Sequence, residues 1–213
     1  MSRSKPRLYL MLPPAFAPAA LAPGFADALA TGEVAAVLMW LAGVEDAPWQ
    51  EAAAVLLPVA HARGTPLLIG GNGERAQRLG ADGVHLEASA EELRAAHKAH
   101  APRLMVGAGG LATRHEAMLA AETGVDYVLF GSADPARERA IPAATIRDLT
   151  EWWSELFQVP CVVSAGGPEE AAALAAAGAD FIAVSEWVWA DPGGPAAAIK
   201  ALSGCLQDMA VAP

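Results

Sequence analysis

The chain is poor in cysteine, in charged residues and above all in positive charge. Its two cysteines, Cys161 and Cys205, are too few for a disulfide scaffold. Lysine and arginine total 14 against 24 aspartates and glutamates, and the net charge of −10 argues against a nucleic-acid or anionic-membrane partner. No run of about 20 apolar residues is free of helix breakers, so we expect no membrane span.

The N-terminus has a pattern that imitates an export signal. Arg3, Lys5 and Arg7 precede an apolar stretch, as they would in a signal peptide. Prolines interrupt that stretch, and Leu8–Leu12 is needed as the first strand of the fold described below. We therefore predict a cytoplasmic protein.

The composition is typical of an α/β protein with a buried parallel sheet. Hydrophobic residues make up 54% of the chain and charged residues only 18%. Buried parallel strands are read as nearly continuous apolar runs, which accounts for this balance. The length of 213 residues suits one domain with a full core. It is short for an eight-unit barrel, which typically needs about 250 residues, so its loops should be short.

A short pattern recurs along the chain: a helix ends at glycine, a small residue and an acidic residue follow, and an apolar strand begins. Clear copies are Gly80-Ala81-Asp82, Gly124-Val125-Asp126 and Gly178-Ala179-Asp180, and Gly32-Glu33 is a weaker fourth. The glycines are 48, 44 and 54 residues apart, and each interval has room for two strand–helix units. Four copies indicate eight units, so we predict a single-domain (β/α)8 barrel over residues 1–213. Aspartates in this position are expected to cap backbone N–H groups in tight turns.

The predicted elements alternate strictly, which favours parallel pairing with right-handed crossovers. The eight strands are expected at Leu8–Leu12, Val34–Leu41, Pro66–Ile69, Gly83–Leu86, Leu104–Ala108, Tyr127–Phe130, Cys161–Ala165 and Phe181–Ser185. The eight helices are expected at Pro18–Ala30, Pro48–Ala62, Glu74–Leu79, Ala90–His100, Arg114–Thr123, Thr145–Phe157, Pro168–Ala177 and Pro195–Leu206. A site on this fold would lie at the C-terminal ends of the strands.

The seventh strand and the helix after it form a candidate anion site. A glycine pair and a proline at the first helical position join them, and such a turn directs backbone N–H groups and the positive helix end at a ligand. Glu186 follows the eighth strand and repels phosphate unless it turns away or pairs with a cation. The residues that we expect to bind a phosphorylated ligand are Ser164, Gly166, Gly167, Ser185 and Glu186.

Four motifs, spread over nearly the whole chain, resemble the thiamine phosphate synthase and thiazole tautomerase family. They are Leu8-Tyr9-Leu10, the sequence GADGVHL at 80–86, Phe130-Gly131 followed by Pro135, and Gly166-Gly167 followed by Gly178-Ala179-Asp180. The resemblance implies a barrel that joins an aminopyrimidine pyrophosphate to a thiazole phosphate. Magnesium assists that reaction and pyrophosphate leaves. A phosphorylated small molecule is therefore the expected partner.

The chain departs from the family where the resemblance implies charged ligands. The family's second strand carries glutamine and arginine for pyrophosphate, whereas Val37–Leu41 has no positive group. The asparagine and aspartate that bind pyrimidine and magnesium fall on Gly70-Gly71, a second metal aspartate falls on Ala90, and a serine falls on Gly109. Only the lysine beyond the sixth strand has a stand-in, Arg139, which keeps the charge but offers a planar fork.

These departures predict a degenerate active site with weak or lost turnover. Developing charge on a leaving pyrophosphate is normally neutralised by magnesium, lysine and arginine, and magnesium needs oxygen ligands. We expect no cofactor and no metal ligands in place, unless Glu74, Glu87 or Asp134 rebuild the site. His85 and Arg139 remain the catalytic candidates, His85 because histidine titrates near neutral pH. A packing role for His85 is the alternative.

Two other functions stay open at this point. One is a non-catalytic binding or interaction protein, favoured by the acidic balance and by Glu186. The other is a different enzyme acting on a phosphorylated small molecule with His85, Asp134 and Arg139. Trp152-Trp153 suggests an oligomer contact, so a homodimer is one hypothesis for the assembly. Trp40 and two tryptophans after the eighth strand are expected mainly to fill the barrel and its helix interfaces.

Overall fold

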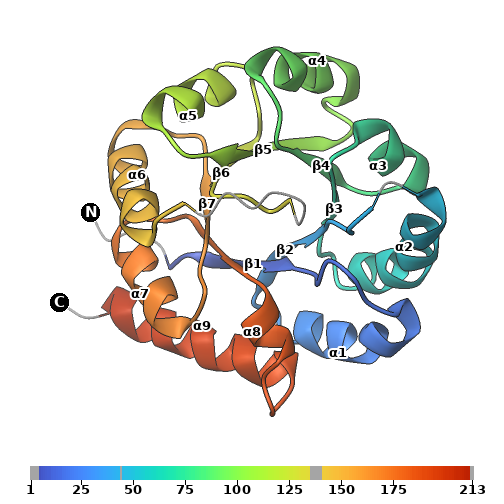
Figure 1. Ribbon diagram of the computed structural model, residues 1–213. Coiled ribbons are helices and arrows are strands. Elements are labelled where there is room, and N and C mark those ends of the chain that lie inside the picture. The colour runs from blue at the N-terminus through green and yellow to red at the C-terminus, as the bar shows by residue number, and fades with distance from the viewer. Residues whose placement is uncertain (1–4, 44, 135–140, 212–213) are drawn as a thin grey trace.

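Eight parallel strands close into a barrel in chain order, as the repeat predicts (Figure 1). The computed structural model describes residues 5–43, 45–134 and 141–211. The strands are β1 (Arg7–Met11), β2 (Val34–Met39), β3 (Leu67–Gly70), β4 (Gly83–Leu86), β5 (Met105–Leu111), β6 (Tyr127–Phe130), β7 (Cys161–Ser164) and β8 (Phe181–Val184). Parallel pairing of β1 with β8 closes the ring. The (β/α)8 prediction is confirmed.

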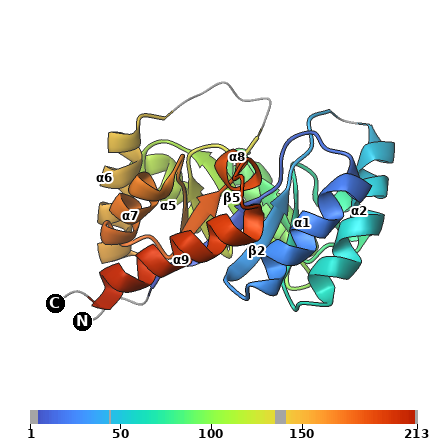
Figure 2. The ribbon, with the colours of Figure 1, turned by 90° about the horizontal axis from the view of Figure 1, so that it is seen from below.

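Helices surround the barrel on the outside (Figures 1 and 2). They are α1 (Pro18–Ala30), α2 (Asp46–His61), α3 (Gly73–Leu79), α4 (Ala90–His100), α5 (Arg114–Ala121), α6 (Ala143–Leu156), α7 (Pro168–Ala176), α8 (Glu186–Trp189) and α9 (Pro195–Val211). The first and last long helices, α1 and α9, lie side by side (Figure 2), so the helical ring closes like the strands. In the described part of the chain no helix is both long and apolar enough to cross a membrane.

The predicted boundaries were wrong at three places that matter for the mouth. Strand β2 ends at Met39, so Trp40 leaves the strand and turns over the barrel. Strand β5 continues to Leu111 through two glycines. Strand β8 ends at Val184, and the single-turn helix α8 follows it. A four-residue helix has too few residues to show a periodic pattern in the sequence.

The three repeat aspartates cap the neighbouring strands at the N-terminal end of the barrel. The N–H of Leu67 donates to Asp82 at 2.8 Å, that of Val106 to Asp126 at 2.7 Å, and that of Cys161 to Asp180 at 2.9 Å. Each aspartate precedes an even-numbered strand and satisfies a donor at the start of β3, β5 or β7. The predicted capping role is confirmed.

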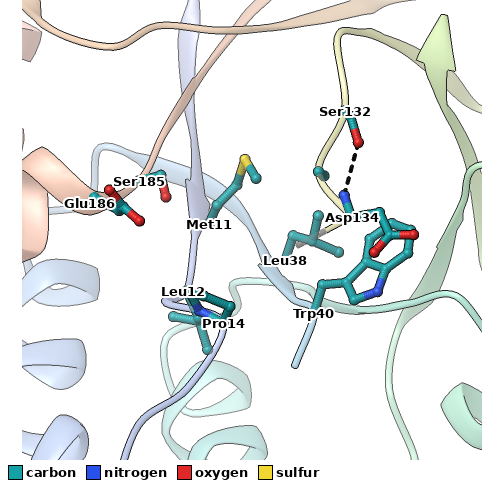
Figure 3. A pocket seen from close by; sticks show the side chains of 10 residues that line it. Met11, Leu12, Pro14, Leu38, Trp40, Ser132, Asp134, Ser185 and Glu186 are labelled. Atoms are coloured by element: carbon teal, nitrogen blue, oxygen red, sulfur yellow. Dashed lines mark hydrogen bonds between the residues drawn. The ribbon is translucent and has the colours of Figure 1, made fainter. Parts of the chain in front are cut away.

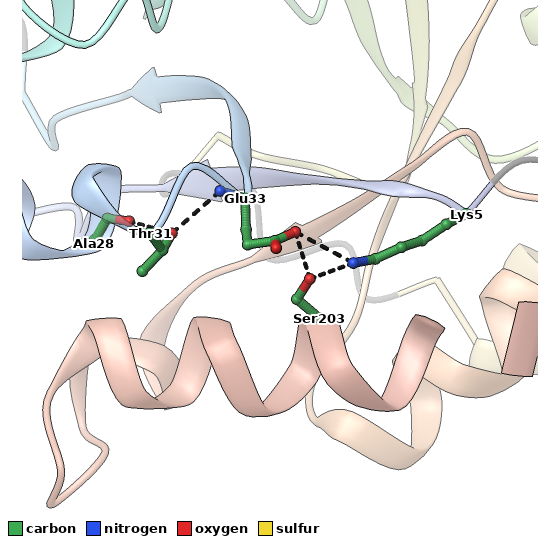
Figure 4. Close-up of polar contacts among 5 residues, drawn as sticks. All are labelled: Lys5, Ala28, Thr31, Glu33 and Ser203. Carbon is green, nitrogen blue, oxygen red and sulfur yellow. Dashed lines mark hydrogen bonds and ion pairs between the residues drawn. The ribbon is translucent and has the colours of Figure 1, made fainter. Parts of the chain in front are cut away.

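The fourth copy of the repeat uses a longer acid to fasten the chain ends (Figure 4). Glu33 accepts hydrogen bonds from Ser203 of α9 at 2.5 Å and from Lys5, just before β1, at 3.2 Å. Lys5 also donates to Ser203. The bond from Ser203, together with Lys5, lowers the pKa of Glu33 below its usual 4.5. This polar cluster joins the N-terminal segment, β2 and the last helix.

Two apolar layers form the core. The larger one lies between the strands and the helices, where Phe25, Trp49 and Trp153 are among the largest buried side chains. The smaller layer fills the barrel interior and includes Tyr9, Leu38, Leu68, Tyr127, Leu129 and Val162. A filled interior leaves room for a ligand only at the ends of the barrel.

Candidate active site

A cavity of about 170 Å³ lies at the C-terminal mouth of the barrel (Figure 3). Apolar side chains line its centre, and two pairs of polar residues, Ser185 with Glu186 and Ser132 with Asp134, lie on opposite sides of it. The described residues that line the cavity are Met11, Leu12, Pro14, Leu38, Trp40, Ser132, Ala133, Asp134, Ser185 and Glu186. They come from the ends of β1, β2, β6 and β8, which is where a barrel of this type places its site. Among them there is no lysine, arginine or histidine.

Trp40 lines one side of the mouth and packs on the glycine pair at the end of β3. A Cβ at Gly70 would lie 2.2 Å from Cγ and Cδ2 of the indole, and a Cβ at Gly71 would lie 3.5 Å from its Cζ2. The other neighbour of the indole is the ring of His85, in an edge contact with centroids 5.8 Å apart. The indole therefore occupies the space that a side chain at position 70 would use, and it would be in ordinary contact with a Cβ at position 71.

His85 lies below Trp40, fully buried inside the barrel instead of exposed at the mouth. Its Nδ1 is 2.8 Å from the hydroxyl of Tyr127, which is 2.8 Å from the hydroxyl of Tyr9. Burial lowers the pKa of His85 to about 3, so the imidazole is neutral at neutral pH. Within the described residues, Nε2 has no hydrogen-bond partner. A catalytic role for His85 stays a prediction.

Glu87 joins the loop after β4 to the loop after β6. Its carboxylate accepts hydrogen bonds from the Ser132 hydroxyl at 3.0 and 2.8 Å, from the Asp134 amide at 3.1 Å, and from the Ala133 amide. The side chain passes Gly109, where a Cβ would lie 3.3 Å from Cγ of Glu87. Glu87 therefore fixes the turn that forms one polar side of the mouth.

The predicted phosphate-binding residues divide into two groups. Ser185 and Glu186 line the mouth cavity, and Ser185 precedes α8 without capping it through its side chain. Ser164, Gly166 and Gly167 are not among the residues that line the cavity. The amide of Gly166 donates to the carboxylate of Glu170 at 2.7 Å, so the chain itself already uses one donor of the expected cradle. Phosphate binding by these residues stays a prediction.

The other candidates fall elsewhere. Arg139, the predicted stand-in for the family's lysine, lies outside the described residues. The two tryptophans of α8 hold the rim, because Trp187 donates to the Ala165 carbonyl at 3.1 Å and Trp189 donates to the Met11 carbonyl at 2.9 Å.

The mouth does not fit a magnesium ion as far as the described residues show. They contain no group of three or more histidine, cysteine, aspartate or glutamate side chains that could hold a metal. The magnesium aspartate that the family resemblance implies after the third strand falls on Gly71, which has no side-chain oxygen. Magnesium requires several oxygen ligands in octahedral geometry.

The comparisons with known proteins agree with the barrel and its motifs. A family model, thiamine monophosphate synthase, matches residues 8–188. The chain belongs to this family. It is 40% identical over 194 residues to the thiamine-phosphate synthase of Rhodospirillum centenum, with 91% of this chain and 94% of the relative covered. It is 36% identical over 216 residues to that of Hyphomonas neptunium, with 98% and 97% covered.

Solved structures agree on the fold. A thiamine phosphate pyrophosphorylase from Pyrococcus furiosus superposes with a TM-score of 0.77 at 23% identity, covering 96% of this chain and 97% of that one. A 3-hexulose-6-phosphate synthase superposes with a TM-score of 0.69 at 18% identity, covering 93% and 99%. The second likeness shows that barrels of this shape occur in proteins with different names and activities, so the fold alone does not define the chemistry of the site.

The sequence did not predict that rings at the mouth and in the interior of this thiamine monophosphate synthase family member pack directly on glycines. The sequence predicts Trp40 mainly as filler, with stacking on a heteroaromatic ring as the alternative, and suggests Glu87 only as a metal ligand. The signal available in the sequence was three glycines within strands, each of which lies against a ring in the structure. Gly70 lies under Trp40, Gly107 under Tyr127 and Gly109 under His85, and in each case a Cβ would lie less than 2.5 Å from the ring. A glycine inside a strand often marks such a close approach.

Proposed function

We propose that this thiamine monophosphate synthase family member binds a phosphorylated thiazole- or pyrimidine-type ligand at the mouth of its barrel, with weak or lost turnover of the family reaction. The observation that carries the proposal is the indole of Trp40 over Gly70-Gly71. It gives the mouth a flat apolar wall that suits a heteroaromatic ring. It also occupies the space above Gly70, where the family resemblance implies a pyrimidine ligand.

The named relatives support an origin in thiamine phosphate synthesis. Proteins called thiamine-phosphate synthase share 36% and 40% of their residues with this chain over nearly its whole length. Removal of a single group that stabilises developing charge typically lowers the rate by about 10²–10³. The described mouth residues provide carboxylates and hydroxyls in place of several such groups. We therefore expect catalysis well below that of an enzyme with a complete site.

Calorimetry tests the ligand. Thiazole phosphate and thiamine phosphate are titrated into the wild-type chain and into Trp40→Ala. Saturable binding by the wild type that weakens about tenfold in Trp40→Ala supports the proposal, because stacking on an aromatic ring contributes about 0.5–1.5 kcal/mol beyond its buried area. Trp152→Ala, in α6 and away from the mouth, is the matched control. Absence of binding to the wild type would sink the ligand part of the proposal.

A different enzyme on the same scaffold is less well supported. That hypothesis uses His85 as an acid or base, and the structure buries this ring beneath Trp40 with a pKa of about 3. A general base works best with a pKa near the working pH. An activity on another phosphorylated substrate that disappears in His85→Gln, while the variant stays folded, would favour this alternative over the main proposal.

A further inference from the structure

The turn after β6 has the donor arrangement of an anion site. Two consecutive amides, of Ala133 and Asp134, and the hydroxyl of Ser132 all point at one carboxylate, that of Glu87. Successive backbone N–H groups that converge in this way form a concavity that suits an oxyanion. Hydrogen bonds to a charged acceptor are also stronger than neutral ones. Glu87 provides the oxyanion from within the chain.

The side chain of Glu87 also passes a further buried polar atom. A Cβ at Gly109 would lie 2.3 Å from Nε2 of His85 and 3.3 Å from Cγ of Glu87, so both side chains meet above this glycine. Nε2 is fully buried and has no hydrogen-bond partner among the described residues. A buried polar atom left unpaired is costly, which makes it a strong pointer to a ligand group that pairs with it.

The hydrogen-bonded chain from Tyr9 through Tyr127 to Nδ1 of His85 decides whether Nε2 carries the ring proton. If Tyr9 donates to Tyr127 and Tyr127 donates to Nδ1, the single ring proton of neutral His85 sits on Nε2. Nε2 is then a donor near the side chain of Glu87, which passes the same glycine. An anion that reaches Nε2 selects this tautomer, because the other tautomer would present a lone pair to it.

We infer that the Ser132 hydroxyl, the amides of Ala133 and Asp134 and Nε2 of His85 form a latent oxyanion site, and that the side chain of Glu87 fills it. A phosphate or pyrophosphate group enters by displacing the Glu87 carboxylate, which makes Glu87 a residue that limits anion affinity at the mouth. The inference rests on the proposed function only for the class of ligand. The site itself is built from contacts of this chain.

Titration with pyrophosphate tests the site. Calorimetry compares the wild-type chain with Glu87→Ala, which empties the donors, and with Glu91→Ala. Glu91 lies exposed in the first turn of α4, so its loss removes the same charge without touching the donors. We expect Glu87→Ala to bind pyrophosphate at least about tenfold more tightly than the wild type, and Glu91→Ala to equal the wild type. Equal gains in both variants would show a general charge effect and overturn the inference.

Nitrogen NMR on the histidine rings gives a readout that a loss of charge alone does not move. In Glu87→Ala, pyrophosphate should shift Nε2 of His85 and the amides of Ala133 and Asp134 together. Glu87→Gln, which keeps the side-chain length, should show a smaller gain and guards against misfolding of the alanine variant. Well-folded Glu87→Ala and Glu87→Gln that bind pyrophosphate no better than the wild type would contradict the site.

Failure of this inference is distinguishable from failure of the proposed function. If the wild type binds thiamine phosphate but Glu87→Ala gains no affinity for pyrophosphate, the proposed function stands and the latent site is ruled out. If Glu87→Ala binds pyrophosphate more tightly but the wild type binds neither thiazole phosphate nor thiamine phosphate, the latent site stands and the proposed function is ruled out.

Discussion

The two ends of this barrel satisfy their backbone donors in different ways. At the N-terminal end three aspartates in equivalent positions each cap the first donors of a neighbouring strand. At the C-terminal mouth, Glu87 reaches from the loop after β4 to an amide in the turn after β6, and Glu170, in the first turn of α7, accepts from the amide of Gly166 just before its own helix. The regular end follows from a repeated sequence pattern and stabilises the fold. The irregular end depends on individual side chains, as expected for the face that carries function.

The largest expected effect concerns His85 beneath the mouth. Its pKa is lowered to about 3 in the folded chain, against a usual 6.5, because burial disfavours the charged ring. The unfolded chain therefore binds the extra proton between these values. The contribution of the neutral ring to stability is fully present above pH 6.5. The free energy of unfolding falls by up to about 1.4 kcal/mol per pH unit as the pH drops toward 3.

Denaturant unfolding over this pH range measures the effect. His85→Gln should flatten the acid limb of stability against pH, even if the variant is less stable at neutral pH. His115→Gln, on the exposed surface of α5, is the control for the loss of a histidine. Wild type and His85→Gln with parallel acid limbs would contradict the burial of a neutral ring.

The next prediction concerns the aspartate caps at the regular, N-terminal end of the barrel. Asp180→Ala leaves the N–H of Cys161 without its partner inside the chain, and the cost should be about 1–3 kcal/mol of unfolding free energy. Asp180→Asn keeps an acceptor oxygen and should lose less. Asp27→Ala, on the exposed face of α1, should change stability by no more than about 0.5 kcal/mol. Urea unfolding at neutral pH provides all three values.

A third prediction concerns the interlock at the mouth. Gly70→Ala places a methyl group inside the ring of Trp40, and overpacking of this kind costs about 1–3 kcal/mol. In a double-mutant cycle Trp40→Ala should relieve that cost, with a coupling of about 1 kcal/mol. Gly64→Ala is unsuitable as a control because of its positive φ, whereas Gly204→Ala in α9 meets open space. Additive effects of Gly70→Ala and Trp40→Ala on the free energy of unfolding would show that the placement of the Trp40 ring does not require a glycine at position 70.

The smallest effect concerns the polar cluster at the chain ends. The pKa of Glu33 is lowered by the hydrogen bond from Ser203 and by Lys5, so its contribution is present above the usual 4.5 and is lost as the pH falls through the folded value. The carboxylate is partly exposed, and screening limits the contribution to about 0.5 kcal/mol. Glu33→Gln should remove this part of the acid dependence. A Ser203→Ala variant with unchanged acid dependence would show that Ser203 is not the main cause.

The sequence was informative about the regular end and much less so about the mouth. The glycine–aspartate repeat predicted the strand number, the barrel and the capping aspartates, because these depend on local patterns. Placement of the mouth residues depends on packing between distant strands. Trp40 contacts Gly70 and His85, and Glu87 reaches Ser132, yet no local pattern links these positions. The same limit explains why His85, at the expected place along β4, lies inside the barrel.

The rate of thiamine phosphate formation tests the central claim most directly, which is that the family scaffold is kept while the chemistry of its mouth is weakened. Purified chain is mixed with aminopyrimidine pyrophosphate, thiazole phosphate and magnesium, beside the Rhodospirillum centenum relative under the same conditions. We predict formation at least about 10²-fold slower than by that relative, and little change when magnesium is omitted. Rapid, magnesium-dependent formation by the wild-type chain would contradict the account.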